Sequence, residues 1–149
     1  MRKASLLLAA GIETMELAGC ATSSGVIANP SASQTPYHSV YIVDHGGSGA
    51  DMDANMQREF LKHGFAVKAG TEDGDHAGAD LIVRYADDWK WDIKMYLWSL
   101  DVMVYDSKSG TLIATGRWKN STLHGFYDSE KVVTQVVDDT LAKANIRQQ

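Results

Sequence analysis

Alternating apolar and polar positions in the second half of the chain predict β-strands. From Leu81 to Ile93 the odd positions are mostly apolar and the even positions mostly polar, which indicates one buried and one solvated strand face. We expect a turn near residues 87–92, with one long strand as the alternative, followed by a second alternating segment over residues 94–106. A turn then leads to a strand over residues 111–119. Together these segments predict an antiparallel meander of about three strands.

Two other segments carry apolar residues at helical spacing. Met52, Met56 and Phe60 recur every four residues, and a glycine follows as a stop signal. A second helix is expected over residues 129–145, with Asp128 as its N-cap and a stripe rich in valine. Because valine has only modest helix propensity, this helix needs packing against the sheet.

Short β-branched runs flank the first helix and complete the order of elements. Residues 39–44 and 65–69 have the composition of strands. The order is therefore strand, helix, strand, meander and helix. This order predicts an α+β fold, in which two helices pack on one face of a mixed, mostly antiparallel sheet of about five strands.

The first twenty residues follow a different pattern. Two basic residues precede a short apolar run that ends at Ile12, which is far below the ~20 residues of a membrane-spanning helix. Positive charge, a short apolar run and small residues form the layout of a secretory signal. The segment closes with Leu17-Ala18-Gly19-Cys20, which resembles the lipobox of bacterial lipoproteins.

The lipobox resemblance implies a processed and acylated N-terminus. It implies a signal peptide over residues 1–19 and covalent diacylglycerol and N-acyl chains on Cys20, with no other cofactor. Cys20 is the only cysteine, so no other thiol remains to mispair in an oxidising compartment. Ala21 resembles the outer-membrane sorting pattern, with inner-membrane retention as the alternative. Glu13 and Glu16 depart from the family pattern, because carboxylates in a membrane-entering segment cost a few kcal/mol.

A tether is expected between the lipid and the folded domain. Residues 21–36 contain no charged or aromatic residue and include both prolines of the chain. Such a segment buries too little apolar surface to fold alone, and sixteen flexible residues reach on the order of 20–25 Å. We therefore expect the lipidated Cys20 and its tether over residues 20–36, and a single periplasmic domain over residues 37–149.

Composition narrows the range of partners. The chain has 149 residues, of which 44% are hydrophobic, and this is enough for one domain with an apolar core. Its net charge of −5 at pH 7 argues against nucleic-acid binding through a basic face. The expected partners are the lipid bilayer, through Cys20, and an envelope protein.

A turn of the form Asp-x-x-x-Gly-x-Leu occupies residues 106–112. Together with residues 79–83, 89–92 and 96–97, it resembles small lipid-anchored bacterial domains of unknown function, of the DUF4136 kind. The resemblance spans Ala79 to Leu123. It implies an envelope lipoprotein and no particular chemistry.

Catalytic and metal-binding patterns are weak. Residues 44–49 form a glycine-rich loop between a strand and a helix, yet they match no phosphate-binding motif. The acidic residues 72–76 lack the spacing of a calcium loop, and the five histidines show no His-x-x-x-His pair. We therefore expect no enzymatic activity and no metal site. A hydrolase built around His45 or His124 is the weaker alternative.

The four tryptophans are the remaining candidates for binding. Trp118 lies on an apolar strand face, and Trp98 shares such a face with Leu100, so both are expected in the core. Trp89 and Trp91 belong to the core as well, unless they lie at a hairpin tip and form a platform for a glycan or a protein. The leading hypothesis is a lipid-anchored, non-enzymatic module that binds or scaffolds an envelope component on the periplasmic side of the outer membrane. The alternative is a ligand- or glycan-binding module that uses exposed tryptophans.

Overall fold

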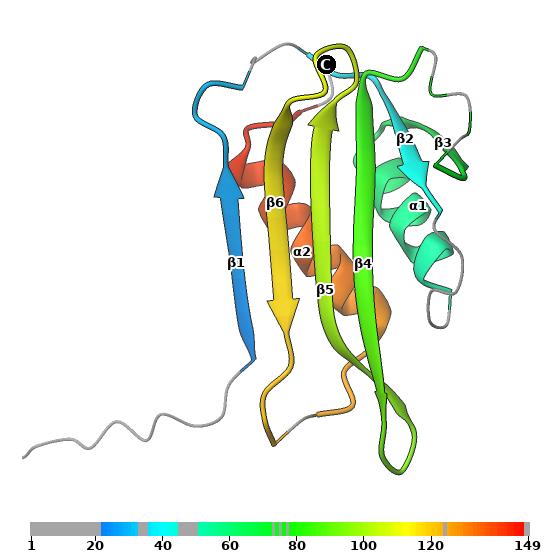
Figure 1. The fold of residues 1–149 in the computed structure, drawn as a ribbon, viewed down its shortest axis with the longest axis vertical. Coiled ribbons are helices and arrows are strands. Elements are labelled where there is room, and N and C mark those ends of the chain that lie inside the picture. The colour runs from blue at the N-terminus through cyan, green and yellow to red at the C-terminus, as the bar shows by residue number, and fades with distance from the viewer. Residues whose placement is uncertain are drawn as a thin grey trace, which may run out of the picture.

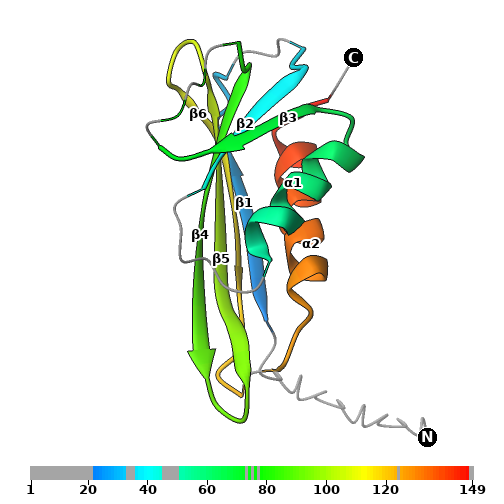
Figure 2. The ribbon, with the colours of Figure 1, turned by 90° about the vertical axis from the view of Figure 1, so that its right-hand side faces the viewer.

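The chain forms an open mixed sheet with both helices on one face (Figures 1 and 2). The computed structural model describes residues 22–32, 36–44, 51–72, 74, 76, 78–123 and 125–147. Within these residues the sheet has six strands in the order β1-β6-β5-β4-β2-β3, which confirms the α+β class with one strand more than expected. The strands are β1 (Ser23–Ala28), β2 (Ser39–Val43), β3 (Ala66–Gly70), β4 (Leu81–Trp91), β5 (Met95–Asp106) and β6 (Leu112–Lys119), and the helices are α1 (Met52–Lys62) and α2 (Ser129–Lys143).

The pairing of the strands is mostly antiparallel. The parallel pairs are β2 with β3 and β2 with β4, so β2 is parallel to both of its neighbours. β4 and β5 form a long hairpin that continues to the pair Trp91 and Met95. The turn expected near residues 87–92 lies later, at residues 92–94, because pairing with β5 continues past Asp88. The alternative, one long strand, describes Leu81–Trp91.

The prediction of a flexible tether over residues 20–36 is wrong for Ser23–Ala28, because these residues form β1. β1 pairs with β6 along all six residues, from Ser23 opposite Lys119 to Ala28 opposite Ala114. Backbone hydrogen bonds to β6 hold this edge strand, so it needs no alternation of apolar residues. The side chain of Gln135 on α2 also donates to Ser24 Oγ at 3.4 Å. The folded domain thus begins well before residue 37.

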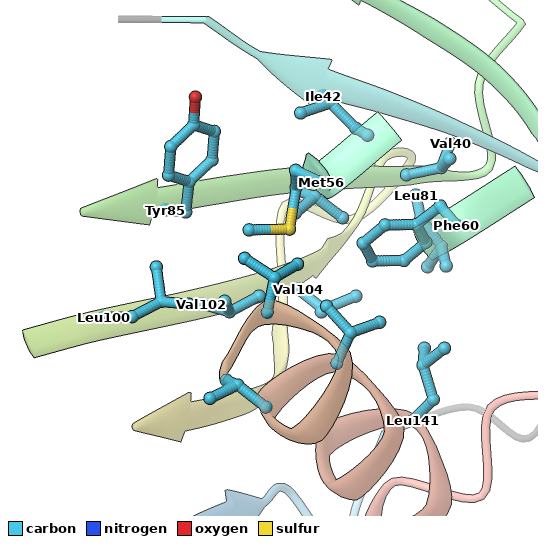
Figure 3. Close-up of a cluster of buried hydrophobic side chains, with 14 of the residues drawn as sticks. Val40, Ile42, Met56, Phe60, Leu81, Tyr85, Leu100, Val102, Val104 and Leu141 are labelled. Atoms are coloured by element: carbon cyan, nitrogen blue, oxygen red, sulfur yellow. The ribbon is translucent and has the colours of Figure 1, made fainter. Parts of the chain in front are cut away.

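The core lies between the helices and the sheet (Figures 2 and 3). Met56 and Phe60 project from α1 into this layer and are fully buried, as their helical spacing predicts. α2 contacts β1, β5 and β6 through its valine stripe. It approaches β6 so closely that a side chain at Gly116 would collide with Thr140. This contact confirms that α2 packs on the sheet.

Hydrogen bonds and backbone conformation in the turn between β5 and β6 explain the Asp-x-x-x-Gly pattern of residues 106–110. The Asp106 carboxylate accepts hydrogen bonds from the backbone N–H groups of Lys108 (3.1 Å) and Ser109 (2.7 Å). These bonds, above all the one from Ser109, lower the pKa of Asp106 because they stabilise its charged form. Gly110 has φ 68°, a conformation that suits glycine. The motif is thus a structural turn.

Candidate functional site

The sequence-predicted site residues occupy different environments. Cys20, His45 and His124 lie outside the described residues. Trp91 is 70% exposed near the tip of the β4–β5 hairpin, whereas Trp89 is half-buried and packs against the core. Because the hairpin projects beyond α2 (Figure 2), the strand face that is buried at Tyr85 is only half-buried at Trp89 and is solvated at Trp91. The structure therefore brings only one of the two indoles to the surface.

Exposed apolar side chains gather at this end of the sheet. Six of the nine large exposed hydrophobic residues in the described part of the chain lie on the hairpin or on the connection from β6 to α2. Single exposed apolar residues are ordinary, but a cluster of them marks an interaction surface. We call this cluster the apolar rim; it comprises Trp91, Ile93, Met95, Leu123, Phe126 and Tyr127.

Aromatic contacts join the two segments of the apolar rim. The ring of Phe126 lies edge-on to Tyr96 of β5, with centroids 5.8 Å apart. Tyr127 lies edge-on to the buried Trp118 of β6 at 5.5 Å. Perpendicular rings at these distances are favourable. The β6–α2 connection is therefore packed against the end of the sheet.

Asn120 fixes the start of the same connection. Its side chain is 4% exposed and donates to the carbonyls of Leu97 (3.0 Å) and Gly125 (2.9 Å). The Asn120 Oδ1 atom accepts from the N–H groups of Ser121 (2.9 Å) and Gly125 (3.1 Å). One buried amide thus ties β5 to the chain that carries Phe126.

Lysine side chains surround the aromatic groups of this end. The Nζ atom of Lys90 lies 3.8 Å from the centroid of the Trp98 ring, and that of Lys119 lies 5.7 Å from it. Lys94 Nζ lies 4.7 Å from the Phe126 centroid. Such cation–π contacts place each ammonium group against the face of an aromatic ring.

The chain enters the sheet at the end that carries the apolar rim. Ser23, the first residue of β1, pairs with Lys119, which in turn pairs with Ser99 of β5. The β4–β5 hairpin extends three further cross-strand pairs beyond that level. Figure 1 shows the start of β1, the hairpin tip and the β6–α2 connection at one end of the molecule.

A second polar cluster lies between α1 and α2. Glu59 is 4% exposed and accepts from Thr134 Oγ1 (2.8 Å) and Lys62 Nζ (3.0 Å). The Nε2 atom of His63 is 2.7 Å from Asp138 and 3.7 Å from Glu59. One ligand atom from each of these three side chains could hold a metal ion, since the atoms lie within 4.8 Å of one another.

Sequence reasoning missed this cluster because it searched for pairs of histidines. The Glu59 and His63 spacing of four residues is a usable signal, but Asp138 comes from a helix far along the chain. Hydrogen bonds and ion pairs between these groups already satisfy the carboxylates. The cluster therefore stabilises the contact between α1 and α2.

Asp80 joins the start of β2 to the start of β4. Its Oδ2 atom accepts from the N–H groups of His38 (2.8 Å) and Ser39 (3.1 Å) and from Ser39 Oγ (3.1 Å). The bond from the His38 N–H is the main cause that lowers the pKa of Asp80, because it stabilises the charged carboxylate. This carboxylate has a structural role in strand pairing.

Replacing Asp80 by asparagine is expected to lower the free energy of unfolding by about 1–2 kcal/mol, since charge-assisted hydrogen bonds are replaced by weaker ones. The folded pKa of Asp80 lies below its unfolded value, so its stabilisation is complete above the unfolded pKa. It is lost as the pH falls below about 4. Urea unfolding between pH 7 and pH 3 should therefore show a shallower acid slope for D80N. The exposed Asp88→Asn serves as the control, and an unchanged slope in D80N would contradict the assignment.

The fold has structural neighbours, although no protein-family model and no curated protein matches the sequence. The chain is similar to a PelC dodecamer structure from Paraburkholderia phytofirmans, with a TM-score of 0.57 and 12% identity over 86% of this chain and 100% of that one. A variant of the PelC dodecamer from the same organism gives a TM-score of 0.54 at 11% identity, with the same coverage. At this identity the similarity shows the fold alone. Neither helix in the described part of the chain is long and apolar enough to cross a bilayer.

Proposed function

We propose that the chain is a lipid-anchored, non-enzymatic domain of the bacterial envelope that scaffolds another envelope component. The lipid is the diacylglycerol and N-acyl group on Cys20, and the domain faces the periplasm from the outer membrane. One observation supports this proposal above all others: β1 begins only three residues after Cys20 and pairs with β6 along its whole length. The lipobox-like segment is therefore followed at once by the folded sheet.

This placement decides how the anchor would act. Three extended residues span at most about 11 Å, so the lipid would hold the sheet against the bilayer surface. Each buried CH₂ group contributes about 0.8 kcal/mol, and two or three acyl chains therefore give stable attachment. A domain fixed so closely to the membrane suits a scaffold.

The partner that we propose first is another copy of this chain. The similar PelC structures are described as dodecamers, and the sheet here places β1 and β3 at its two edges. Edge strands offer backbone groups to a neighbouring chain. Mass measurement of the lipidated chain in detergent should give a multiple of the protomer mass. A monomer at all concentrations would contradict self-association.

The anchor is tested by labelling with radioactive palmitate in a bacterial host. The native chain should incorporate label and sediment with membranes, and Cys20→Ala should do neither. Ala21→Asp is the matched control that retains the thiol; it should keep the label and shift the protein toward the inner membrane. An unlabelled native chain in the soluble fraction would overturn the proposed function.

A further inference from the structure

We propose that the apolar rim enters the headgroup region of the same bilayer that holds the lipid, so that the domain stands with its strands upright on the membrane. This inference rests on the proposed lipidation of Cys20 and adds a second, non-covalent contact with the bilayer. Its basis is the position, the shape and the chemistry of the rim.

The two contacts can reach the same height. The hairpin extends three cross-strand pairs beyond the level of Ser23, which is about 10 Å at ~3.4 Å per residue. Cys20 precedes Ser23 by three residues, and the chain between them reaches about 10–11 Å in the same direction when extended. The tip of the hairpin and the lipid can therefore reach one membrane plane together.

The two contacts are also separated along the sheet. Three strand spacings lie between β1 and β4, which amounts to about 14 Å at ~4.8 Å per spacing. A single lipid would leave the domain free to tilt. A second contact at this separation fixes the angle between the sheet and the membrane.

The rim has the shape of a protrusion. The hairpin projects past the end of α2 (Figure 2), and the exposed Trp91 and Met95 form its last cross-strand pair. Ile93, in the chain reversal, is 83% exposed, and Leu123 of the adjoining connection is 76% exposed. A protruding apolar tip can insert into a fluid layer directly, whereas a protein partner would need a matching cavity.

The side chains suit the interface between water and lipid. Trp91 and Tyr127 combine an apolar ring with a polar group, a combination that favours the level of the headgroups. Lys90 and Lys94 lie beside the rim with their ammonium groups over the rings of Trp98 and Phe126, and these positive charges also attract lipid phosphates. Asp92 is the carboxylate of the chain reversal at residues 92–94 and is exposed to water.

The test uses an environment-sensitive NBD probe on the full lipidated chain. Because Cys20 is the only native cysteine and carries the lipid in this proposal, Ile93→Cys supplies a single free thiol. Lys108→Cys, in the exposed β5–β6 turn at the opposite end, is the matched control. Vesicles of phosphatidylethanolamine and phosphatidylglycerol should shift the emission of the probe at position 93 to shorter wavelength and raise it several-fold. The probe at position 108 should stay as it is in water.

Lipids with spin-labelled acyl chains separate the bilayer from other occupants, because they quench only a probe that lies within the membrane. Strong quenching at position 93 and none at position 108 supports the proposal. Membrane-bound protein with equal water exposure at both positions overturns it and leaves the lipid anchor intact. A shielded but unquenched probe at position 93 also overturns it, since a protein then covers the rim. A chain without lipid overturns both the proposed function and this inference.

Discussion

Trp118→Ala is expected to lower the free energy of unfolding by about 3–5 kcal/mol, the usual cost of truncating a large buried aromatic side chain. Trp118 is 2% exposed, lies opposite Leu100 on β5 and packs edge-on against Tyr127. Its removal leaves a cavity under the end of the sheet, and it also removes the support of one residue of the apolar rim. Since small domains are stable by only about 5–15 kcal/mol, the variant should lose a large part of its stability.

The matched control for Trp118→Ala is Trp91→Ala, which removes the same side chain from an exposed position near the same end. We expect it to change the free energy of unfolding by less than about 0.5 kcal/mol, since Trp91 is 70% exposed. Urea unfolding followed by circular dichroism measures both variants without depending on tryptophan emission. Equal losses in the two variants would mean that Trp91 is as deeply buried in solution as Trp118.

The parts of the fold that the sequence predicts well are those in which burial repeats regularly. Leu81, Val83 and Tyr85 occupy every second position and are buried, and Met56 and Phe60 keep helical spacing and are buried. Each of these segments faces the core along most of its length. Their pattern therefore follows directly from the packing of helices on one sheet face.

β1 shows why an edge strand escapes this reasoning. Within Ser23–Ala28 no side chain is fully buried, and most are exposed. The strand is held by its backbone pairing with β6, so the identity of its side chains carries little information. Only the partner strand and the register determine that this segment is ordered, and neither can be derived from local composition.

A β-bulge explains why the prediction that Trp98 of β5 is buried is wrong. Strict alternation predicts that Trp98 shares a buried face with Leu100. The register instead pairs Asp88 with Ser99 and Trp89 with Leu97, which leaves Trp98 as an extra residue. Leu97 and Leu100 are buried as a result, while Trp98 lies partly exposed beside lysines.

The apolar rim itself is a property of tertiary structure. Trp91 lies on the face that buries Leu81, Val83 and Tyr85 of β4, and it is exposed because the hairpin is longer than the layer of helices beneath it. Phe126 and Tyr127 belong to a connection without regular structure, so no periodicity marks them. The sequence could suggest an exposed tryptophan at a hairpin tip, but it could not bring these two segments together.

Asn120→Ala is expected to lower the free energy of unfolding by roughly 2–4 kcal/mol, because each buried polar group left without a partner costs about 1–3 kcal/mol. The variant removes two donors and one acceptor that now serve Leu97, Ser121 and Gly125. Hydrogen exchange of the backbone amides between β6 and α2 should accelerate as well, since this amide anchors the connection to β5.

Asn29→Ala is the matched control for the Asn120 variant. The Asn29 side chain also makes two backbone hydrogen bonds, to the Leu112 carbonyl and from the Ser31 N–H, but it does so in an exposed setting. Water replaces the lost partners there, and the expected cost is about 0.5–1 kcal/mol. If Asn120→Ala costs no more than this, the buried amide does not hold the connection in place. If it costs the larger amount and also lowers the membrane quenching of a probe at position 93, the fixed geometry of the connection contributes to bilayer contact.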